Sequence, residues 1–147
     1  AGSGSLGLEA LSRGAAQLYF CEKATPCLKA LSRNFKELGV EDRAHLKRFD
    51  LARGLSKLYE HGPFDLVLMD PPFDLMRRPS GTGSADVRKI LAELGTTDIL
   101  KSDGLIAFEA PARTFRVEPD LKGWGLELEL RREYGTTSLW LVRKHSR

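Results

Sequence analysis

Strand-like apolar runs and helix-like patterns alternate along the first two-thirds of this 147-residue chain, and this alternation constrains the fold more than any other feature. The clearest strand is FDLVLMD (64–70), a continuous apolar run ending in an acid, as expected of a central parallel strand buried on both faces. Further strands are expected at 15–22, a short buried run, at 45–50, where the pattern is weaker, and at 104–110. Repeated β–α units of this kind predict an α/β fold with a doubly wound, mostly parallel sheet.

The segment 25–39 carries the signals of a helix with defined ends. Thr25 is expected as its N-cap, Pro26 as its first helical residue and Gly39 as its C-terminal stop. Apolar residues recur within it at helical spacing, as a helix packed on a sheet requires. Shorter helices are expected at 51–62 and at 84–95, with Ser84 as the cap of the second.

The chain ends in a different pattern. LELELRREY (126–134) and TSLWLVRK (137–144) read as strands around a short turn containing Gly135, which predicts a C-terminal antiparallel hairpin. No internal repeat and no long linker interrupts the sequence, so residues 1–147 are expected to form a single domain.

The opening AGSGSLGLEA places Gly2, Gly4 and Gly7 at the G-x-G-x-x-G spacing of a nucleotide-binding turn. Glycines let the backbone approach a ligand, and the helix beginning near Leu6 directs its positive N-terminal end at the site. Any adenosine-bearing cofactor would suit such a turn, and a glycine turn without a ligand is the alternative. Because this turn normally follows a strand, the first strand is expected upstream of Ala1, which would make the domain N-terminally incomplete.

Two acids follow the next predicted strands. Glu22 ends its strand 18 residues beyond Gly4, where a carboxylate can accept hydrogen bonds from both ribose hydroxyls of an adenosine moiety. A solvated surface glutamate is the alternative. Asp50 could meet the exocyclic amine of adenine or cap the helix that starts at Leu51, and the two roles are compatible.

The stretch LVLMDPPFD carries the most specific chemistry. Two prolines directly after a buried strand fix an extended turn, which presents the Asp70 carboxylate and a proline carbonyl at the sheet's carboxyl edge beside Phe73. The amino group of a nucleobase needs this set, because two acceptors gripping its N–H bonds localise a lone pair otherwise delocalised into the ring. A dehydrogenase needs a proton donor or acceptor instead, and none is indicated here. A plain turn preceded by an acid is the alternative.

Composition adds weaker constraints. The net charge of +3 and the pI near 9.0 favour an anionic partner without requiring one. The two cysteines, Cys21 and Cys27, form no disulfide framework and no zinc pattern, and the three histidines are far apart without cysteines nearby, so no structural metal is expected. No apolar run approaches the roughly 20 residues of a membrane span, and no signal peptide is recognised, so a cytoplasmic location is expected.

Four motifs together, AGSGSLGLEALSRGA, FCEK, DPPF and YGTTSLWLVRK, resemble the RsmD-type 16S rRNA guanine-N2 methyltransferases, which depend on S-adenosylmethionine. The resemblance covers nearly the whole chain. It implies the Rossmann-like fold of class I methyltransferases and transfer of a methyl group from S-adenosylmethionine to the N2 amine of a guanine in 16S rRNA. Members of this family carry a first strand, and a basic segment before it, ahead of the glycine turn; this sequence contains neither.

The resemblance also implies a mechanism and a set of site residues. Methyl transfer would be an in-line displacement that needs positioning but no metal and no covalent enzyme intermediate. Cofactor contacts would come from Ala1, Gly2, Ser3 and Gly4 at the methionine end, Glu22 with Lys23 at the ribose, Asp50 with Leu51 at the adenine, and Asp70. The target guanine would be held by Asp70 and the Pro71 carbonyl, next to Pro72, with Phe73 stacked on its ring.

The RNA itself would meet basic residues around the mouth of the site. Phosphate contact is one interpretation of these charges and a solvated surface is the other. The guanine must leave its stack to enter. The partner would be 16S rRNA or a small-subunit assembly particle, and the protein a monomer without metal or membrane contact. The candidate RNA-binding residues are Arg77, Arg78, Arg88 and Lys89.

Three other functions are alternatives to an rRNA methyltransferase. DPPF-like turns also serve DNA adenine or cytosine amino-methyltransferases. An NAD-binding oxidoreductase is supported only by the glycine spacing and Glu22. A catalytically silent RNA-binding module is the third alternative.

Overall fold

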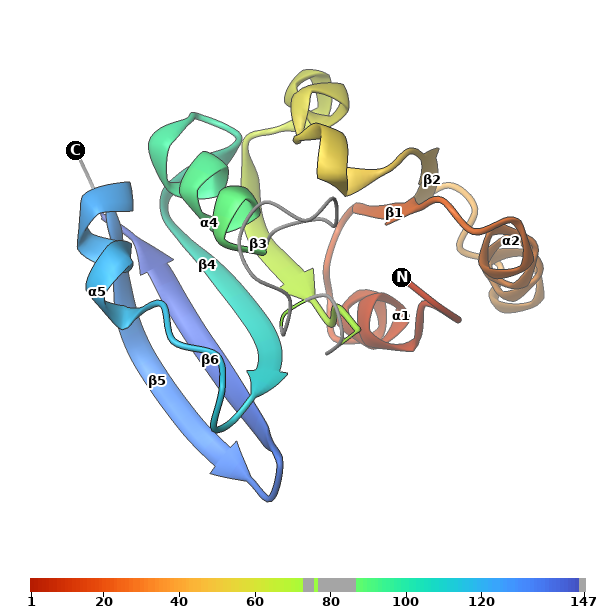
Figure 1. The fold of residues 1–147 in the computed structure, drawn as a ribbon. Coiled ribbons are helices and arrows are strands. Elements are labelled where there is room, and N and C mark those ends of the chain that lie inside the picture. Colours follow the sequence, from red (N-terminus) through yellow and green to blue (C-terminus); the bar gives the residue numbers. More distant parts are fainter. Residues whose placement is uncertain (73–75, 77–86, 146–147) are drawn as a thin grey trace. The chain divides into compact units, whose positions relative to one another are not determined.

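The computed structural model describes residues 1–72, 76 and 87–145 (Figure 1). The chain divides into two compact units, Ala1–Leu51 and Ala52–Arg147, and each is described by itself. The interpretation of residues 1–147 as a single domain therefore stays a prediction.

The first unit places two helices against a two-stranded parallel sheet. Strands β1 and β2 pair in register from Leu18 opposite Ala44 to Glu22 opposite Arg48. Parallel pairing of consecutive strands requires a crossover, and the long helix between them provides it. The elements in chain order are α1 (Ser5–Ser12), β1 (Leu18–Glu22), α2 (Thr25–Leu38) and β2 (Ala44–Arg48).

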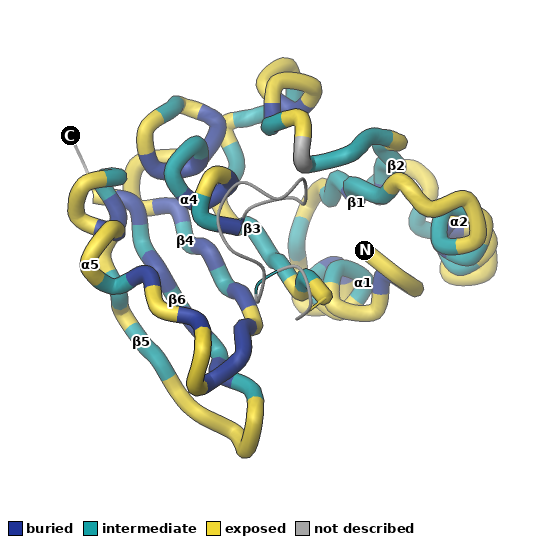
Figure 2. The backbone as a smooth tube through the Cα atoms, in the orientation of Figure 1, coloured by how far each residue is buried: buried dark blue, intermediate teal, exposed yellow. Residues whose placement is uncertain are grey.

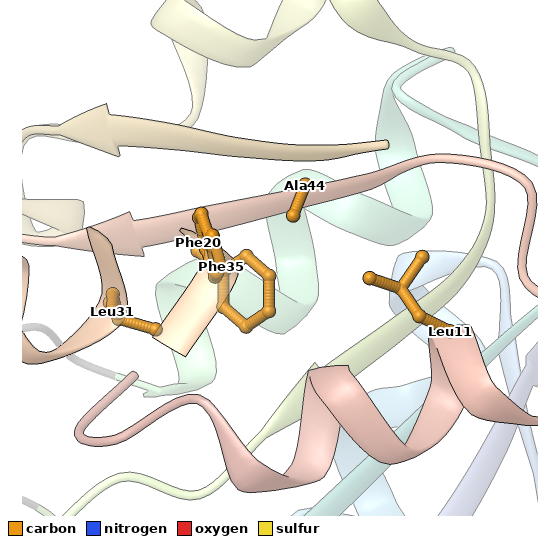
Figure 3. Packing of buried hydrophobic residues seen from close by; sticks show 5 residues of the cluster. All are labelled: Leu11, Phe20, Leu31, Phe35 and Ala44. Atoms are coloured by element: carbon orange, nitrogen blue, oxygen red, sulfur yellow. The ribbon is translucent and has the colours of Figure 1, made fainter. Parts of the chain in front are cut away.

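The core of this unit joins both helices to both strands. Figure 3 shows Phe20 of β1 beside Phe35 of α2, with ring centroids 4.9 Å apart. Leu31 lies one helical turn before Phe35 and is fully buried. Leu11 of α1 and Ala44 of β2 complete the cluster. This cluster fixes α2 on the sheet and so fixes what α2 presents to the glycine turn.

The second unit contains a four-stranded sheet in the order β3-β4-β6-β5. Strand β4 pairs in parallel with β3 on one side and antiparallel with β6 on the other (Figure 1). Strand β5 pairs antiparallel with β6 and completes the C-terminal hairpin. Its elements are η1 (Leu51–Arg53, which begins at the last residue of the first unit), η2 (Ser56–His61), β3 (Phe64–Met69), α4 (Val87–Thr96), β4 (Leu100–Pro111), α5 (Glu118–Leu121), η3 (Lys122–Trp124), β5 (Leu126–Tyr134) and β6 (Thr137–Lys144).

Burial alternates along β6, as a strand with one face in the core requires (Figure 2). Trp140 stacks on Phe108 of β4, with centroids 5.5 Å apart and planes 12° from parallel. The Trp140 indole N–H donates to Ser138 Oγ (2.8 Å), and that hydroxyl donates to the Ala110 carbonyl (3.0 Å). The indole N–H of Trp140 and the hydroxyl of Ser138 are thus satisfied within the sheet.

Most predicted elements are confirmed, with local corrections. Helix α2 ends at Gly39 in the left-handed region (φ 62°), as predicted, but its N-cap is Ala24 rather than Thr25, which lies inside the helix together with Pro26. Segment 51–62 forms two 3₁₀ helices instead of one helix. The expected cap Ser84 lies outside the described residues.

The expectation that β3 is buried on both faces is wrong. Leu66 in its middle is 43% exposed, and among the described residues β3 lies at the edge of the four-stranded sheet. Among the described residues no strand pairs with both β1 and β3. A first strand upstream of Ala1 stays a prediction.

Candidate active site

The glycine motif forms a tight turn at the start of α1. The Gly4 N–H donates to the Ala1 carbonyl (2.9 Å), and both Gly2 (φ 57°) and Gly4 (φ 82°) adopt left-handed conformations. Gly4 is the N-cap of α1 and has no side chain to bond the first-turn N–H groups. The turn therefore leaves the positive end of this helix available to a polar ligand.

The three glycines of the motif serve different purposes. A Cβ on Gly4 would lie 2.3 Å from Leu31 Cδ2, and one on Gly7 would lie 2.6 Å from atoms of Leu18 and Phe20. These two glycines thus allow α1 to pack closely on β1 and α2. At Gly2 a Cβ would meet nothing within 4 Å, so this is the position with open space beside the backbone.

Glu22 at the end of β1 binds the turn directly. Its Oε2 accepts from the N-terminal ammonium of Ala1 (2.6 Å) and from the backbone N–H of Gly2 (3.2 Å), and its Oε1 accepts from the backbone N–H groups of Lys23 (2.7 Å) and Ala24 (2.8 Å). Burial alone would raise the pKa of the Glu22 carboxyl, but the hydrogen bonds from Ala24 and the other three nitrogens lower it to about 2. The carboxylate is therefore ionised at neutral pH.

One side-chain bond and one backbone bond join the chain at the ends of β1 and β2. Lys23 Nζ donates to Asp50 Oδ2 at 3.0 Å, and the Phe49 N–H donates to the Glu22 carbonyl at 3.2 Å. Asp50 thus lies just beyond the end of β2, at the same edge as Glu22, while Leu51 begins η1. The structure places Glu22, Lys23 and Asp50 together at the carboxyl end of the parallel pair.

These residues fit an adenosine cofactor of the S-adenosylmethionine type. The fit rests on the open side of Gly2, the uncapped first turn of α1 and an ionised carboxylate at the strand end. Sequence reasoning missed one function of Glu22, which is to hold the turn itself. Its contact with the ribose stays a prediction.

Asp70 lies in the second unit, directly after β3, and is exposed. It is thus accessible to solvent and not buried in the core of the second unit, and its contact with a substrate stays a prediction. Pro71 is half-buried and Pro72 is exposed, and neither belongs to a helix or strand. Phe73, the predicted stacking residue, lies outside the described residues.

Of the four predicted RNA-binding residues, the structure describes Arg88 and Lys89. Arg88 on α4 pairs with Asp120 (3.1 Å) and lies over the Phe115 ring (5.3 Å to the centroid), so it contributes to packing within the unit. Lys89 is exposed. Arg77 and Arg78 lie outside the described residues.

The described residues hold neither a candidate metal site nor a candidate membrane-spanning helix. No group of three or more His, Cys, Asp or Glu side chains in that part of the chain could hold a metal ion. No helix among residues 1–72, 76 and 87–145 is long and apolar enough to cross a membrane.

Residues 1–143 match the profile of the family described as "Conserved hypothetical protein 95". A Bacillus subtilis (strain 168) protein named "Putative rRNA methyltransferase YlbH" is 27% identical over 146 residues, which cover 98% of this chain and 72% of that protein. The solved structure of the "putative methylase HI0767" from Haemophilus influenzae superimposes with a TM-score of 0.78 at 26% identity, over 99% of this chain and 83% of the other. That of "Putative methyltransferase yhhF" from Escherichia coli gives 0.74 at 25% identity, over 99% and 72%.

A more distant structure bears on the fold. The structure described as "SMU.776, a putative methyltransferase complexed with SAH" superimposes with a TM-score of 0.69 at 15% identity, over 96% of this chain and 42% of that one. The Rossmann-like fold of class I methyltransferases, with its parallel strands and antiparallel hairpin, is thereby confirmed. By its motifs, its fold and the matching profile, this chain belongs to the "Conserved hypothetical protein 95" family, the RsmD-type methyltransferases that use S-adenosylmethionine.

Proposed function

We propose that this protein transfers a methyl group from S-adenosylmethionine to the exocyclic N2 amine of a guanine in 16S rRNA, free or within a small-subunit assembly particle. The observation that carries the proposal is the exposed Asp70 carboxylate at the carboxyl end of β3, followed by two prolines that restrict the backbone behind it.

The chemistry requires that the amine become nucleophilic. The Asp70 carboxylate and the Pro71 carbonyl would each accept one N–H of the amine, which localises the nitrogen lone pair toward the methyl group. The cofactor supplies an activated methyl on a sulfonium, itself a good leaving group. The protein then has to orient two reactants, and the N–H proton lost after transfer lies against the Asp70 carboxylate.

The choice of RNA rests on two supports. A relative named as an rRNA methyltransferase matches 98% of this chain, and the chain carries a net charge of +3. Lys89, exposed on α4, is a candidate phosphate contact in the described part, and Arg77 and Arg78 are candidates outside it. Arg88 is the weakest of the four, because its guanidinium already pairs with Asp120.

Asp70→Ala and Asp70→Asn test the catalytic assignment. Asparagine keeps an acceptor oxygen but loses the charge, so we expect partial activity in Asp70→Asn and at least a hundred-fold loss of kcat in Asp70→Ala. Calorimetry with S-adenosylhomocysteine should give affinities within a few-fold of the wild type for both variants. Asp65→Ala, which replaces an exposed acid within β3, is the control, and unchanged turnover in Asp70→Ala would reject the role of Asp70.

Substrate class is tested by competition. Tritium transfer from labelled S-adenosylmethionine would be measured with 16S rRNA, small-subunit particles and duplex DNA in one reaction, followed by digestion to nucleosides. We expect N2-methylguanosine from an RNA substrate. Label found in methyladenine or methylcytosine of the DNA would favour the DNA amino-methyltransferase alternative.

A further inference from the structure

The glycines of the turn allow its backbone several conformations, so contacts with other residues must select one of them. Glycine adopts positive and negative φ about equally well, and both Gly2 and Gly4 have positive φ here. Rotation of the Ser3–Gly4 peptide changes ψ of Ser3 and φ of Gly4, and glycine takes either sign of φ at little steric cost. Such a rotation would change the directions of the Ser3 carbonyl and the Gly4 N–H, and with them the conformation of the turn.

The peptide group between Ser3 and Gly4 is held at both ends. Its carbonyl, on Ser3, accepts a hydrogen bond from Asn34 Nδ2 at 2.9 Å. Its N–H, on Gly4, donates to the Ala1 carbonyl, also at 2.9 Å. Rotating this peptide would break both bonds at once, so Asn34 and the turn's own hydrogen bond together select one orientation.

Asn34 is well supported for this purpose. It lies on α2 between Leu31 and Phe35, which are 0% and 4% exposed and anchor the helix in the core of the first unit. The turn is held from the other side by Glu22, which accepts the Gly2 N–H. Two consecutive residues of the turn, Gly2 and Ser3, are thus fixed from the end of β1 and from the middle of α2.

We propose that Asn34 is a positioning residue for the cofactor: it fixes the Ser3–Gly4 peptide and so preorganises the turn that receives the methionine end of S-adenosylmethionine. This inference rests on the cofactor part of the proposed function. A turn that must be ordered on binding lowers affinity without changing the reaction of the bound state. Loss of the anchor should therefore raise the KM for S-adenosylmethionine and leave kcat at saturation nearly unchanged.

Asn34→Ala and Asn34→Asp test the proposal in the full chain. Aspartate has the shape of asparagine but no N–H to donate, and its carboxylate would face the Ser3 carbonyl. We expect Asn34→Ala to weaken the affinity for S-adenosylhomocysteine roughly five-fold, the loss of one ordinary hydrogen bond, and Asn34→Asp to weaken it at least as much. Ser32→Ala, an exposed polar-to-alanine change two residues away on α2, should bind like the wild type.

Hydrogen exchange of the Gly4 amide, followed by NMR without cofactor, gives an independent readout. We expect faster Gly4 exchange in Asn34→Ala and Asn34→Asp, with exchange of the core amides of α2 unchanged. Unchanged Gly4 exchange, or faster exchange with unaltered affinity, would overturn the proposal. A wild-type protein that binds no S-adenosylhomocysteine would instead refute the cofactor assignment, while the Gly4 exchange would still report on the anchor.

Discussion

Replacing Gly4 by alanine separates two reasons for having glycine in the turn. Gly4 has a φ of 82°, and a Cβ added there would lie 2.3 Å from Leu31 Cδ2 and 3.1 Å from Phe20 Cε1. Gly2 has a similar φ, 57°, but open space beside it. Gly2→Ala is therefore a matched control that shares the backbone strain and lacks the steric contact.

The expected cost follows from these two terms. An alanine in the left-handed conformation costs about 1–2 kcal/mol of folding free energy, and this cost applies to both variants. Only Gly4→Ala adds overpacking against Leu31, which is fully buried and can move only by displacing its neighbours, for about 1–3 kcal/mol more. We expect the free energy of unfolding to fall by about 2–5 kcal/mol in Gly4→Ala and by about 1–2 kcal/mol in Gly2→Ala.

Urea unfolding followed by circular dichroism measures both values, with the m-value checked for constancy. A second test adds Leu31→Val to Gly4→Ala. If the contact with Leu31 causes the extra loss, the double variant should lose less stability than the sum of the single changes. Equal stability of Gly4→Ala and Gly2→Ala, or strict additivity with Leu31→Val, would refute the packing argument.

Two further predictions concern buried or ionised groups. Lys144 is 3% exposed and donates to the carbonyls of Thr97 and Leu100, just after the end of α4. Lys144→Met should therefore lower the free energy of unfolding by about 2–4 kcal/mol in urea titrations. The control Lys122→Met, at an exposed position, should change it by less than about 0.5 kcal/mol. Glu22 has a folded-state pKa lowered to about 2, so its charged form stabilises the fold above its ordinary pKa of 4.5, and this contribution is lost as the pH falls toward 2. The stability difference between wild type and Glu22→Gln should shrink over that interval in acid titrations, and a constant difference would contradict the assignment.

Short-range signals in the sequence determined much of the fold. Gly39 ends α2 because its left-handed φ suits glycine, and the alternating residues around Gly135 form the β5–β6 hairpin that was predicted. The glycine spacing predicted a turn before a helix, and the run before Asp70 predicted β3. Such features depend on φ preferences and on the spacing of apolar side chains within a few residues, and both can be recognised in the sequence.

Contacts between distant residues were decided only by the tertiary structure. That Gly7 packs on β1, that Glu22 holds the turn and that Asn34 bonds the Ser3 carbonyl depends on how α1, β1 and α2 meet. The partial exposure of Leu66 depends on which distant parts of the chain pack against β3, and no pattern within the strand encodes those contacts. A hydrogen bond spanning 31 residues leaves no trace in residue spacing, because it is set by packing geometry and not by the periodicity of either segment.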